Sequence, residues 1–156
     1  FAQCVIKNKV VFWDRIRDVV YDERGVQDKW GIAPSSMPDW LALVGDQADG
    51  IPGIPRWGAK SSSNVLSHYQ HIENIPENHL DWQPKIRGAK ALADNLAKGR
   101  DDLRLYKTLA TLRKDCPLPE KIDALRWQGA NQAALTDFCA EIDYTHFISR
   151  FDSWQS

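Results

Sequence analysis

The sequence has few of the features that would place it outside the ordinary globular proteins. Its 156 residues contain no apolar run approaching the roughly 18 residues of a membrane-spanning helix. No charged segment followed by an apolar one opens the chain, as a secretory leader would. The three cysteines form no C-x-x-C pair, which argues against a disulfide framework and favours a reduced, cytoplasmic setting. The net charge of −1 confines any nucleic-acid-binding face to a local patch.

What is present fits one soluble domain with a sizeable core. Apolar residues make up 43% and charged residues 26% of the chain, which is usual for a globular protein. The chain begins with Phe1 and not with Met, so we expect it to be a piece of a longer protein. Its oligomeric state cannot be predicted from these features.

Helical periodicity dominates after a short β segment. The first residues alternate around Asn8 and Lys9 as a β-hairpin would, and a further strand is expected at Asp18 to Asp22. Helices are expected from Glu23 to Trp30, between Ser36 and Gly45, from about Ala59 to His71, from Lys85 through Leu96, through Leu103 to Ala110, and after Asn131. The fold class is therefore mainly α with a small N-terminal β element.

Residues that can cap helices mark several of these boundaries. Asp22 precedes the first expected helix and Gly31 follows it. Ser36 and Asp39 have the spacing of a capping box. Asn131 can cap the last long helix.

Two acids, Asp46 and Asp49, lie three residues apart just after an expected helix. One turn could bring both carboxylates toward a common point, and Mg²⁺ prefers such oxygen ligands together with water and phosphate. The alternative is that two exposed acids solvate a turn. An EF-hand is a poor match, because the alternate acidic ligands and the closing glutamate are missing.

A glycine hairpin follows the acids. Gly53 and Gly58 flank a short turn, and a helix is expected to start at about Ala59. The amides at a helix N-terminus can bind phosphate, and Lys60 would sit in that first turn, where its charge opposes the helix dipole unless an anion is near. The alternative is a plain helix entry with a solvated lysine.

Two stretches of the chain contain no acid at all. Gly50 to Ile72 holds Arg56, Lys60, His68 and His71, whereas Trp82 to Ala93 holds Lys85, Arg87 and Lys90. Basic patches on a near-neutral protein are typical of a restricted nucleic-acid footprint, although a solvated helix face is the alternative.

The segment SMPDWLALVGDQADGIPGIPRWGAKSS, followed in order by KIRGAK and LATLRKDCPL, resembles the 5′-to-3′ exonucleases of the flap endonuclease family. The likeness extends from about Phe1 to Phe151. It implies a SAM-like helical region with a helix-hairpin-helix, joined to a metal-dependent nuclease core that acts on duplex or 5′-flap DNA in replication and repair.

The resemblance also implies roles for single residues. Asp46 and Asp49 would belong to an acidic cluster that holds two Mg²⁺ or Mn²⁺ ions, and the carbonyls of Ile54 and Trp57 would be near a bound K⁺. The residues expected to contact the DNA backbone are Gly53, Arg56, Gly58, Lys60, Lys85, Arg87 and Lys90. By this likeness, residues 1–45 are the end of the nuclease core, 46–118 the helix-three-turn-helix region, and 119–156 C-terminal helices packing back on the core.

Three departures from the family pattern bear on activity. Arg56 stands where glycine is usual, so it is either strained, which would put the K⁺ site in doubt, or an added phosphate contact. Gly50 replaces an asparagine. The acidic segment that precedes this region in the family is missing, so we expect little or no nuclease activity from the isolated chain.

Two other functions remain open from the sequence. The chain could be a non-catalytic helix-hairpin-helix module that binds duplex DNA without sequence specificity. It could instead be an interaction domain, with its seven tryptophans marking a partner surface.

Overall fold

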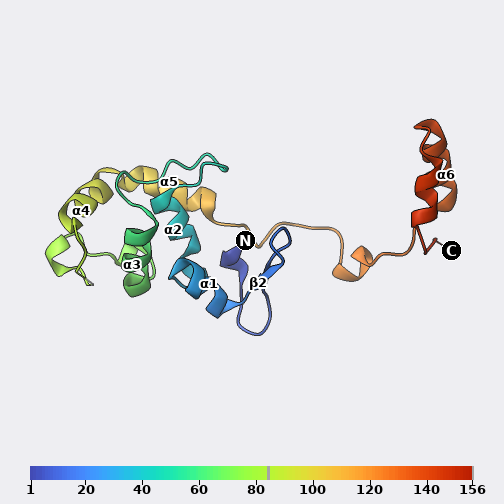
Figure 1. Ribbon diagram of the computed structural model, residues 1–156. Helices are drawn as coiled ribbons and strands as arrows, with labels where there is room; N and C mark the ends of the chain where they lie inside the picture. The colour runs from blue at the N-terminus through green and yellow to red at the C-terminus, as the bar shows by residue number, and fades with distance from the viewer. Residues whose placement is uncertain (84, 156) are drawn as a thin grey trace. The chain divides into compact units, whose positions relative to one another are not determined.

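The structure is a computed structural model that describes residues 1–83 and 85–155, and it divides the chain into two units, Phe1–Lys114 and Asp115–Ser156 (Figure 1). The first unit contains β1 (Phe12–Asp14), β2 (Val19–Tyr21), α1 (Glu23–Trp30), α2 (Met37–Val44), α3 (Ala59–Tyr69), α4 (Ala89–Lys98) and α5 (Arg100–Ala110). Its 3₁₀ turns are η1 (Ala2–Cys4), η2 (Pro34–Ser36), η3 (Ile72–Asn74) and η4 (His79–Asp81). The second unit contains η5 (Ile122–Leu125), α6 (Gln132–Glu141) and η6 (Thr145–Arg150). The expectation of a mainly helical chain with a small β element is confirmed.

The β element is a two-stranded antiparallel sheet in which Trp13 lies opposite Val20. One face packs on α1, because Phe12 stacks on Tyr21 at 5.6 Å and Tyr21 lies 5.7 Å from Trp30. The turn predicted at Asn8 and Lys9 forms only an isolated bridge between Ile6 and Val10, and the sheet itself pairs later residues.

Side-chain caps fix the start of α1 but not that of α2. Asp22 accepts a 2.8 Å hydrogen bond from the Gly25 N–H, and Gly31 ends α1 at φ 71°, as predicted. The predicted capping box at Ser36 and Asp39 is wrong, since Ser36 makes no cap bond. Asp39 is instead fully buried, and a buried carboxylate requires strong donors of its own.

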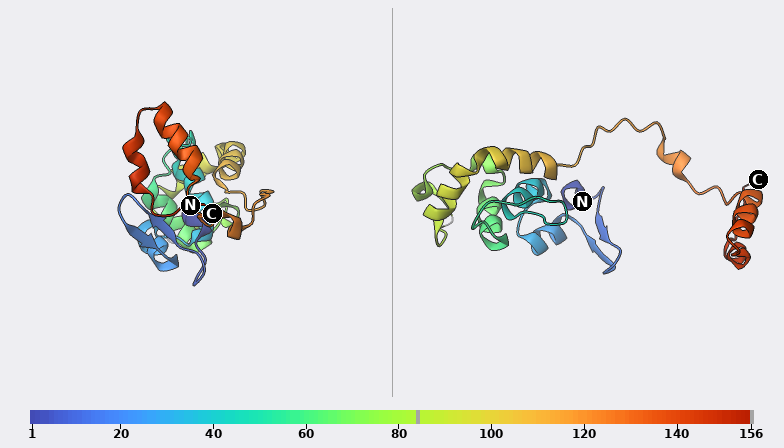
Figure 2. Two further views of the ribbon diagram at one scale, coloured as in Figure 1. Left: turned by 90° about the vertical axis from the view of Figure 1, so that its right-hand side faces the viewer. Right: turned by 90° about the horizontal axis from the view of Figure 1, so that it is seen from above.

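The core of the first unit lies around α2, which packs against α3 and α5. Figure 2 shows α5 running alongside α2. Fully buried apolar side chains from four segments meet there: Val26, Ile32, Leu43, Val65 and Leu66. This arrangement fixes the C-terminal end of α2, from which the acidic loop leaves.

Helix α4 starts later than its periodicity suggested. We expected a helix from Lys85, but α4 begins at Ala89, because Gly88 adopts a left-handed φ of 79° that interrupts helical geometry. Among the described residues, no helix combines the length and apolar character needed to cross a membrane.

In the second unit, Asn131 caps α6 as predicted, by accepting a 2.9 Å hydrogen bond from the Ala134 N–H. Cys139 is fully buried, whereas Phe138 remains 55% exposed. The backbone of Ala130 pairs with the chain near Trp154, which closes this unit on itself. All three cysteines are free thiols.

Candidate nucleic-acid interface

The acidic loop is a closed turn at the end of α2. Asp46 and Ile51 exchange two backbone hydrogen bonds, each 2.8 Å long, and the Asp46 carboxylate accepts a 3.0 Å bond from the Ala48 N–H. The structure therefore places both predicted metal ligands on one short loop, with Asp46 half-buried and Asp49 exposed.

These two carboxylates do not form a complete metal site. Within the described residues, no group of three or more His, Cys, Asp or Glu side chains is close enough to hold a metal ion. Asp46 and Asp49 have the oxygen donors that Mg²⁺ or Mn²⁺ prefers, but those ions need further ligands.

Two glycines bring the ends of the loop into contact. A Cβ atom on Gly53 would lie 2.6 Å from the backbone nitrogen of Gly45, and one on Gly45 would lie 2.7 Å from the carbonyl oxygen of Ile51. Such distances exclude any side chain without a backbone shift. Gly53 therefore packs closely enough to join the acidic loop to the hairpin. Its contact with DNA stays a prediction.

The hairpin turn holds Arg56 in an unusual conformation. The Trp57 N–H donates to the Ile54 carbonyl at 3.0 Å, with Pro55 and Arg56 between them, and Arg56 has φ 71°. These are features of a type II turn, whose third position favours glycine. Arginine in the left-handed region costs roughly 1 kcal/mol, so the strain foreseen for Arg56 is present.

The start of α3 leaves its first amides without a side-chain cap. Gly58 precedes the helix, no acid lies in the first turn, and Lys60 is exposed there. The Gly58 N–H donates to the Ser61 hydroxyl at 3.1 Å. The positive end of the helix dipole therefore faces solvent beside a lysine.

The start of α4 repeats this arrangement. Both helices open with the tripeptide Gly-Ala-Lys, at residues 58–60 and 88–90, and α4 too has no side-chain cap and no acid in its first turn. This repeat is a signal in the sequence that could have identified the start of α4 as a counterpart of the start of α3.

The two basic segments meet in one groove of about 510 Å³. The residues that line it are Arg56, Gly58, Lys60, Ser61, Asn64, Lys85, Ile86, Arg87, Gly88 and Leu92. The structure thus brings together five of the seven predicted DNA-contacting residues. Gly53 and Lys90 are not among the lining residues.

Two buried tryptophans connect the two sides of the groove. Their contact was not predicted from the sequence. Trp57, from the hairpin, and Trp82, from the connector before α4, have ring centroids 5.9 Å apart. The Trp57 indole N–H donates to the Leu92 carbonyl at 3.1 Å, and that of Trp82 to the Pro76 carbonyl at 2.7 Å. The hairpin is therefore anchored to both the connector and α4.

The carbonyls expected near a K⁺ ion flank the strained turn. The Ile54 carbonyl already accepts the Trp57 N–H, while the Asn95 side chain donates to the Pro55 carbonyl at 2.8 Å. Arg56 adds a positive charge to the same turn, which disfavours a bound cation.

Comparisons with known proteins match the chain to a family model and to several relatives. Residues 32–133 match the family model described as 5′-3′ exonuclease, C-terminal SAM fold. The chain is similar to DNA polymerase I of Caldicellulosiruptor bescii, with 34% identity over 94% of this chain and 16% of that protein. It is also similar to the 5′-3′ exonuclease of Aquifex aeolicus, with 28% identity over 95% of this chain and 48% of that protein. The chain thus spans less than half the length of either relative.

Proposed function

Because the chain belongs to the family of 5′-3′ exonuclease C-terminal SAM-fold domains, we propose that it is the DNA-binding part of a metal-dependent 5′-3′ exonuclease or flap endonuclease. The whole protein would hydrolyse phosphodiester bonds at 5′ ends or 5′ flaps of duplex DNA. The observation that carries this proposal is the groove in which the hairpin and the second basic segment meet.

The groove suits the phosphates of a DNA backbone. Uncapped amides at the starts of α3 and α4 can donate hydrogen bonds to phosphate oxygens, and Lys60 and Arg87 add positive charge. None of the described residues that line the groove is aromatic, so base stacking is not provided for. Recognition would therefore depend on backbone shape and charge, without base specificity.

The metal ligands would be Asp46 and Asp49, completed by acids outside this chain. When bound, two divalent ions would supply an activated water and neutralise the charge that develops at the phosphate. The contacts between Gly45 and Gly53 tie the acidic loop to the hairpin, so DNA held in the groove would keep a fixed relation to these carboxylates.

The isolated chain would be a weak metal binder and a poor nuclease. Two carboxylates on one loop leave most of an octahedral Mg²⁺ shell to water. Calorimetric titration with Mg²⁺ should therefore show binding no tighter than millimolar, and sub-micromolar binding would contradict this assignment.

At the hairpin, the Arg56 guanidinium would take over the role of a bound K⁺. A guanidinium and a K⁺ ion would each place positive charge next to the DNA backbone. The strained backbone of Arg56 is also of the kind found where proteins clamp ligands. DNA affinity should then be the same in K⁺ and in Na⁺ at equal ionic strength.

The proposed division of the chain follows the family. Residues 1–45 would complete the nuclease core, 46–118 would form the helix-three-turn-helix region, and 119–156 would be C-terminal helices. A cytoplasmic setting remains part of the proposal.

The test is fluorescence anisotropy of a labelled 5′-flap duplex titrated with the chain in EDTA, at several salt concentrations. Wild type should bind with an affinity that falls steeply with salt. The slope of log K against log salt should drop by about 0.9 for each phosphate contact removed, as in Lys60→Ala or Arg87→Ala.

Lys98→Ala is the matched control, because Lys98 is an exposed lysine at the end of α4 and does not line the groove. Its slope should equal that of wild type. If Lys60→Ala also leaves the slope unchanged, the assignment of the hairpin is wrong.

The second candidate is a non-catalytic module that only binds duplex DNA. It is favoured by the lack of a three-ligand metal cluster in the described residues. Metal-dependent cutting by the full-length protein, abolished by Asp46→Ala, would exclude this candidate.

A further inference from the structure

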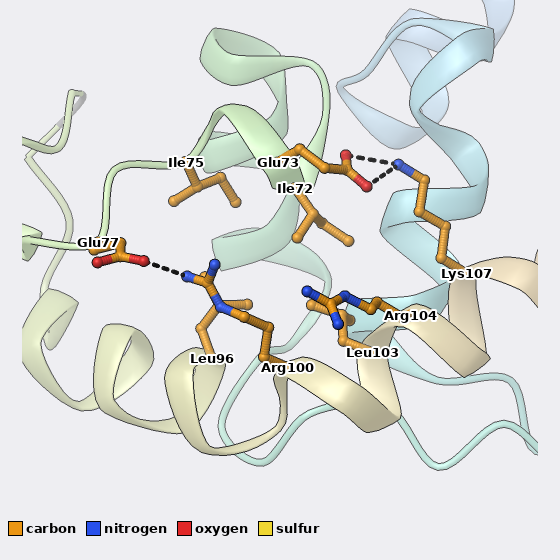
Figure 3. A pocket seen from close by; sticks show the side chains of 9 residues that line it. All are labelled: Ile72, Glu73, Ile75, Glu77, Leu96, Arg100, Leu103, Arg104 and Lys107. Atoms are coloured by element: carbon orange, nitrogen blue, oxygen red, sulfur yellow. Dashed lines mark hydrogen bonds and ion pairs between the residues drawn. The ribbon is translucent and has the colours of Figure 1, made fainter.

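A second cavity, of about 240 Å³, lies between α5 and the segment that joins α3 to α4 (Figure 3). The described residues that line it are all different from those that line the basic groove. Its chemistry also differs from that of the groove, because it combines apolar side chains with charges of both signs.

Four apolar side chains line the cavity: Ile72, Ile75, Leu96 and Leu103. Three of them are nearly inaccessible to solvent, with Ile75 at 6%, Leu96 at 7% and Leu103 at 3% exposure. Only the small part of these side chains that faces the cavity can still be covered, so one apolar side chain placed there would gain a modest free energy.

Two ion pairs border the cavity on either side (Figure 3). Lys107 lies 2.8 Å from Glu73, and Arg100 lies 3.2 Å from Glu77. Lys107 is further held at 2.7 Å by the buried carboxylate of Asp39. These cations already have close partners within the protein.

Arg104 differs from these cations, because the ion pair that it forms is weak. Its side chain is 77% exposed, and the carboxylate of Asp101, 3.4 Å away, is 97% exposed. Such surface pairs contribute little. In Figure 3 the Arg104 guanidinium points into the space between the two ion pairs, where it can receive an incoming carboxylate.

The cavity extends along α5. A neighbouring hollow of about 460 Å³ shares Glu73, Arg104 and Lys107 with it and adds Thr108, Thr111 and Leu112. The first cavity is smaller than the roughly 300 Å³ needed for a whole drug-sized ligand, so it suits one or two side chains of a longer occupant.

We propose that this groove along α5 docks a peptide segment of a partner protein, with an apolar side chain against Leu96 and Leu103 and a neighbouring carboxylate on Arg104. Peptide fits better than nucleic acid, because the ion pairs of Glu73 and Glu77 leave a border of mixed charge that suits one carboxylate better than a polyanion. No aromatic ring is among the described residues that line the cavity, so base stacking is not provided for. Arginine beside an apolar pocket is also a usual anchor of protein interfaces.

The test is selection from a display library of random 12-residue peptides against the full chain. We expect enrichment of sequences with Leu, Ile or Phe within three residues of Asp or Glu. The best peptide is then synthesised, and its affinity is measured on wild type and on Arg104→Glu, where it should weaken roughly tenfold or more.

Arg87→Glu is the matched control in the basic groove. It should lose affinity for duplex DNA and keep the peptide, whereas Arg104→Glu should do the reverse. Failure to enrich acidic-apolar sequences, or equal peptide affinity on Arg104→Glu, would overturn the proposal. A loss of DNA affinity in Arg104→Glu as large as that in Arg87→Glu would identify a nucleic-acid surface instead.

Discussion

The indole rings of Trp57 and Trp82 lie 5.9 Å apart at an inclination of 53°, and both side chains are almost fully buried. Trp57 belongs to the hairpin and Trp82 to the connector that leads to Lys85 and Arg87. An aromatic contact between segments that are distant in sequence therefore links the two halves of the basic groove.

Replacing Trp82 should damage both stability and DNA binding. Trp82→Ala removes a side chain that is 1% exposed, and such truncations cost about 3 to 5 kcal/mol in free energy of unfolding. The connector loses its anchor, so DNA affinity should fall even where the protein remains folded. Urea unfolding and anisotropy at the same temperature measure the two effects.

Trp13→Ala is the control for this change, because Trp13 is 53% exposed in the β element. It should cost under about 1 kcal/mol and leave DNA affinity unchanged. Equal losses in the two variants would show that the Trp57–Trp82 contact does not support the groove.

Removing the strain at Arg56 should raise stability while lowering DNA affinity. Arg56→Gly suits φ 71° and also removes the guanidinium from the groove, whereas Arg56→Ala removes the charge but retains the strain. We expect the glycine variant to be more stable than the alanine variant by about 1 kcal/mol.

Both Arg56 variants should lose the same DNA affinity, because both lack the charge. Thermal unfolding and salt-dependent anisotropy are the measurements. If affinity is retained in Arg56→Gly alone, turn geometry, and not charge, is the contribution of this residue.

The close approach of Gly53 to Gly45 predicts a position that tolerates no side chain. Gly53→Ala would place its Cβ 2.6 Å from the backbone of Val44 and also requires alanine at φ 75°. We expect a loss of at least about 2 kcal/mol, with displacement of the acidic loop.

Gly58→Ala is the matched control for stability, since a Cβ there meets no atom within 4 Å and no left-handed φ is required. Its free energy of unfolding should change by less than about 1 kcal/mol. A Gly53→Ala variant as stable as Gly58→Ala would mean that the loop and hairpin are not rigidly joined.

The features that depend on residues close together in the chain were predicted from the sequence. Asp22 and Asn131 cap their helices because a short polar side chain reaches its own backbone. The basic groove was also predictable in part, because the absence of acids over two stretches is a property of the sequence itself.

Tertiary contacts determine the rest. Asp39 has capping-box spacing, but packing of α2 against α5 buries it and Lys107 becomes its partner, which no local pattern reveals. The packing of Gly53 against Gly45 was also not predicted, because it depends on how closely two segments of backbone approach. The Trp57–Trp82 contact joins residues whose separation gives no periodic signal.

Removing Lys107 should destabilise the protein in a pH-dependent way. Burial alone would lower the pKa of Lys107, but hydrogen bonds to Asp39 and Glu73 outweigh it and raise that pKa above 10.5. Lys107→Met leaves the Asp39 carboxylate buried with fewer donors, so we expect a loss of roughly 3 kcal/mol near neutral pH.

At acid pH, the dependence of stability on pH follows from the lowered pKa of Glu73. Burial would raise the pKa of Glu73, but the hydrogen bond from Lys107 outweighs it and lowers that pKa below 4.5. A lowered pKa in the folded state contributes stability that is complete above 4.5 and is lost as the pH falls through the folded value. Lys107→Met lacks this contribution. The difference in free energy of unfolding between wild type and Lys107→Met should therefore become smaller as the pH falls.

At alkaline pH, stability falls as the pH rises, which is the opposite of its behaviour in acid. Because the pKa of Lys107 is raised in the folded state, its contribution to stability is complete below 10.5 and is lost as the pH rises through the folded value. Urea midpoints of wild type and Lys107→Met should therefore differ most between these limits and converge beyond them. Lys98→Met, which changes an exposed lysine, should follow wild type at every pH. A deficit of constant size across the whole range would mean that Lys107 stabilises the fold by packing of its aliphatic stem and not by its charge.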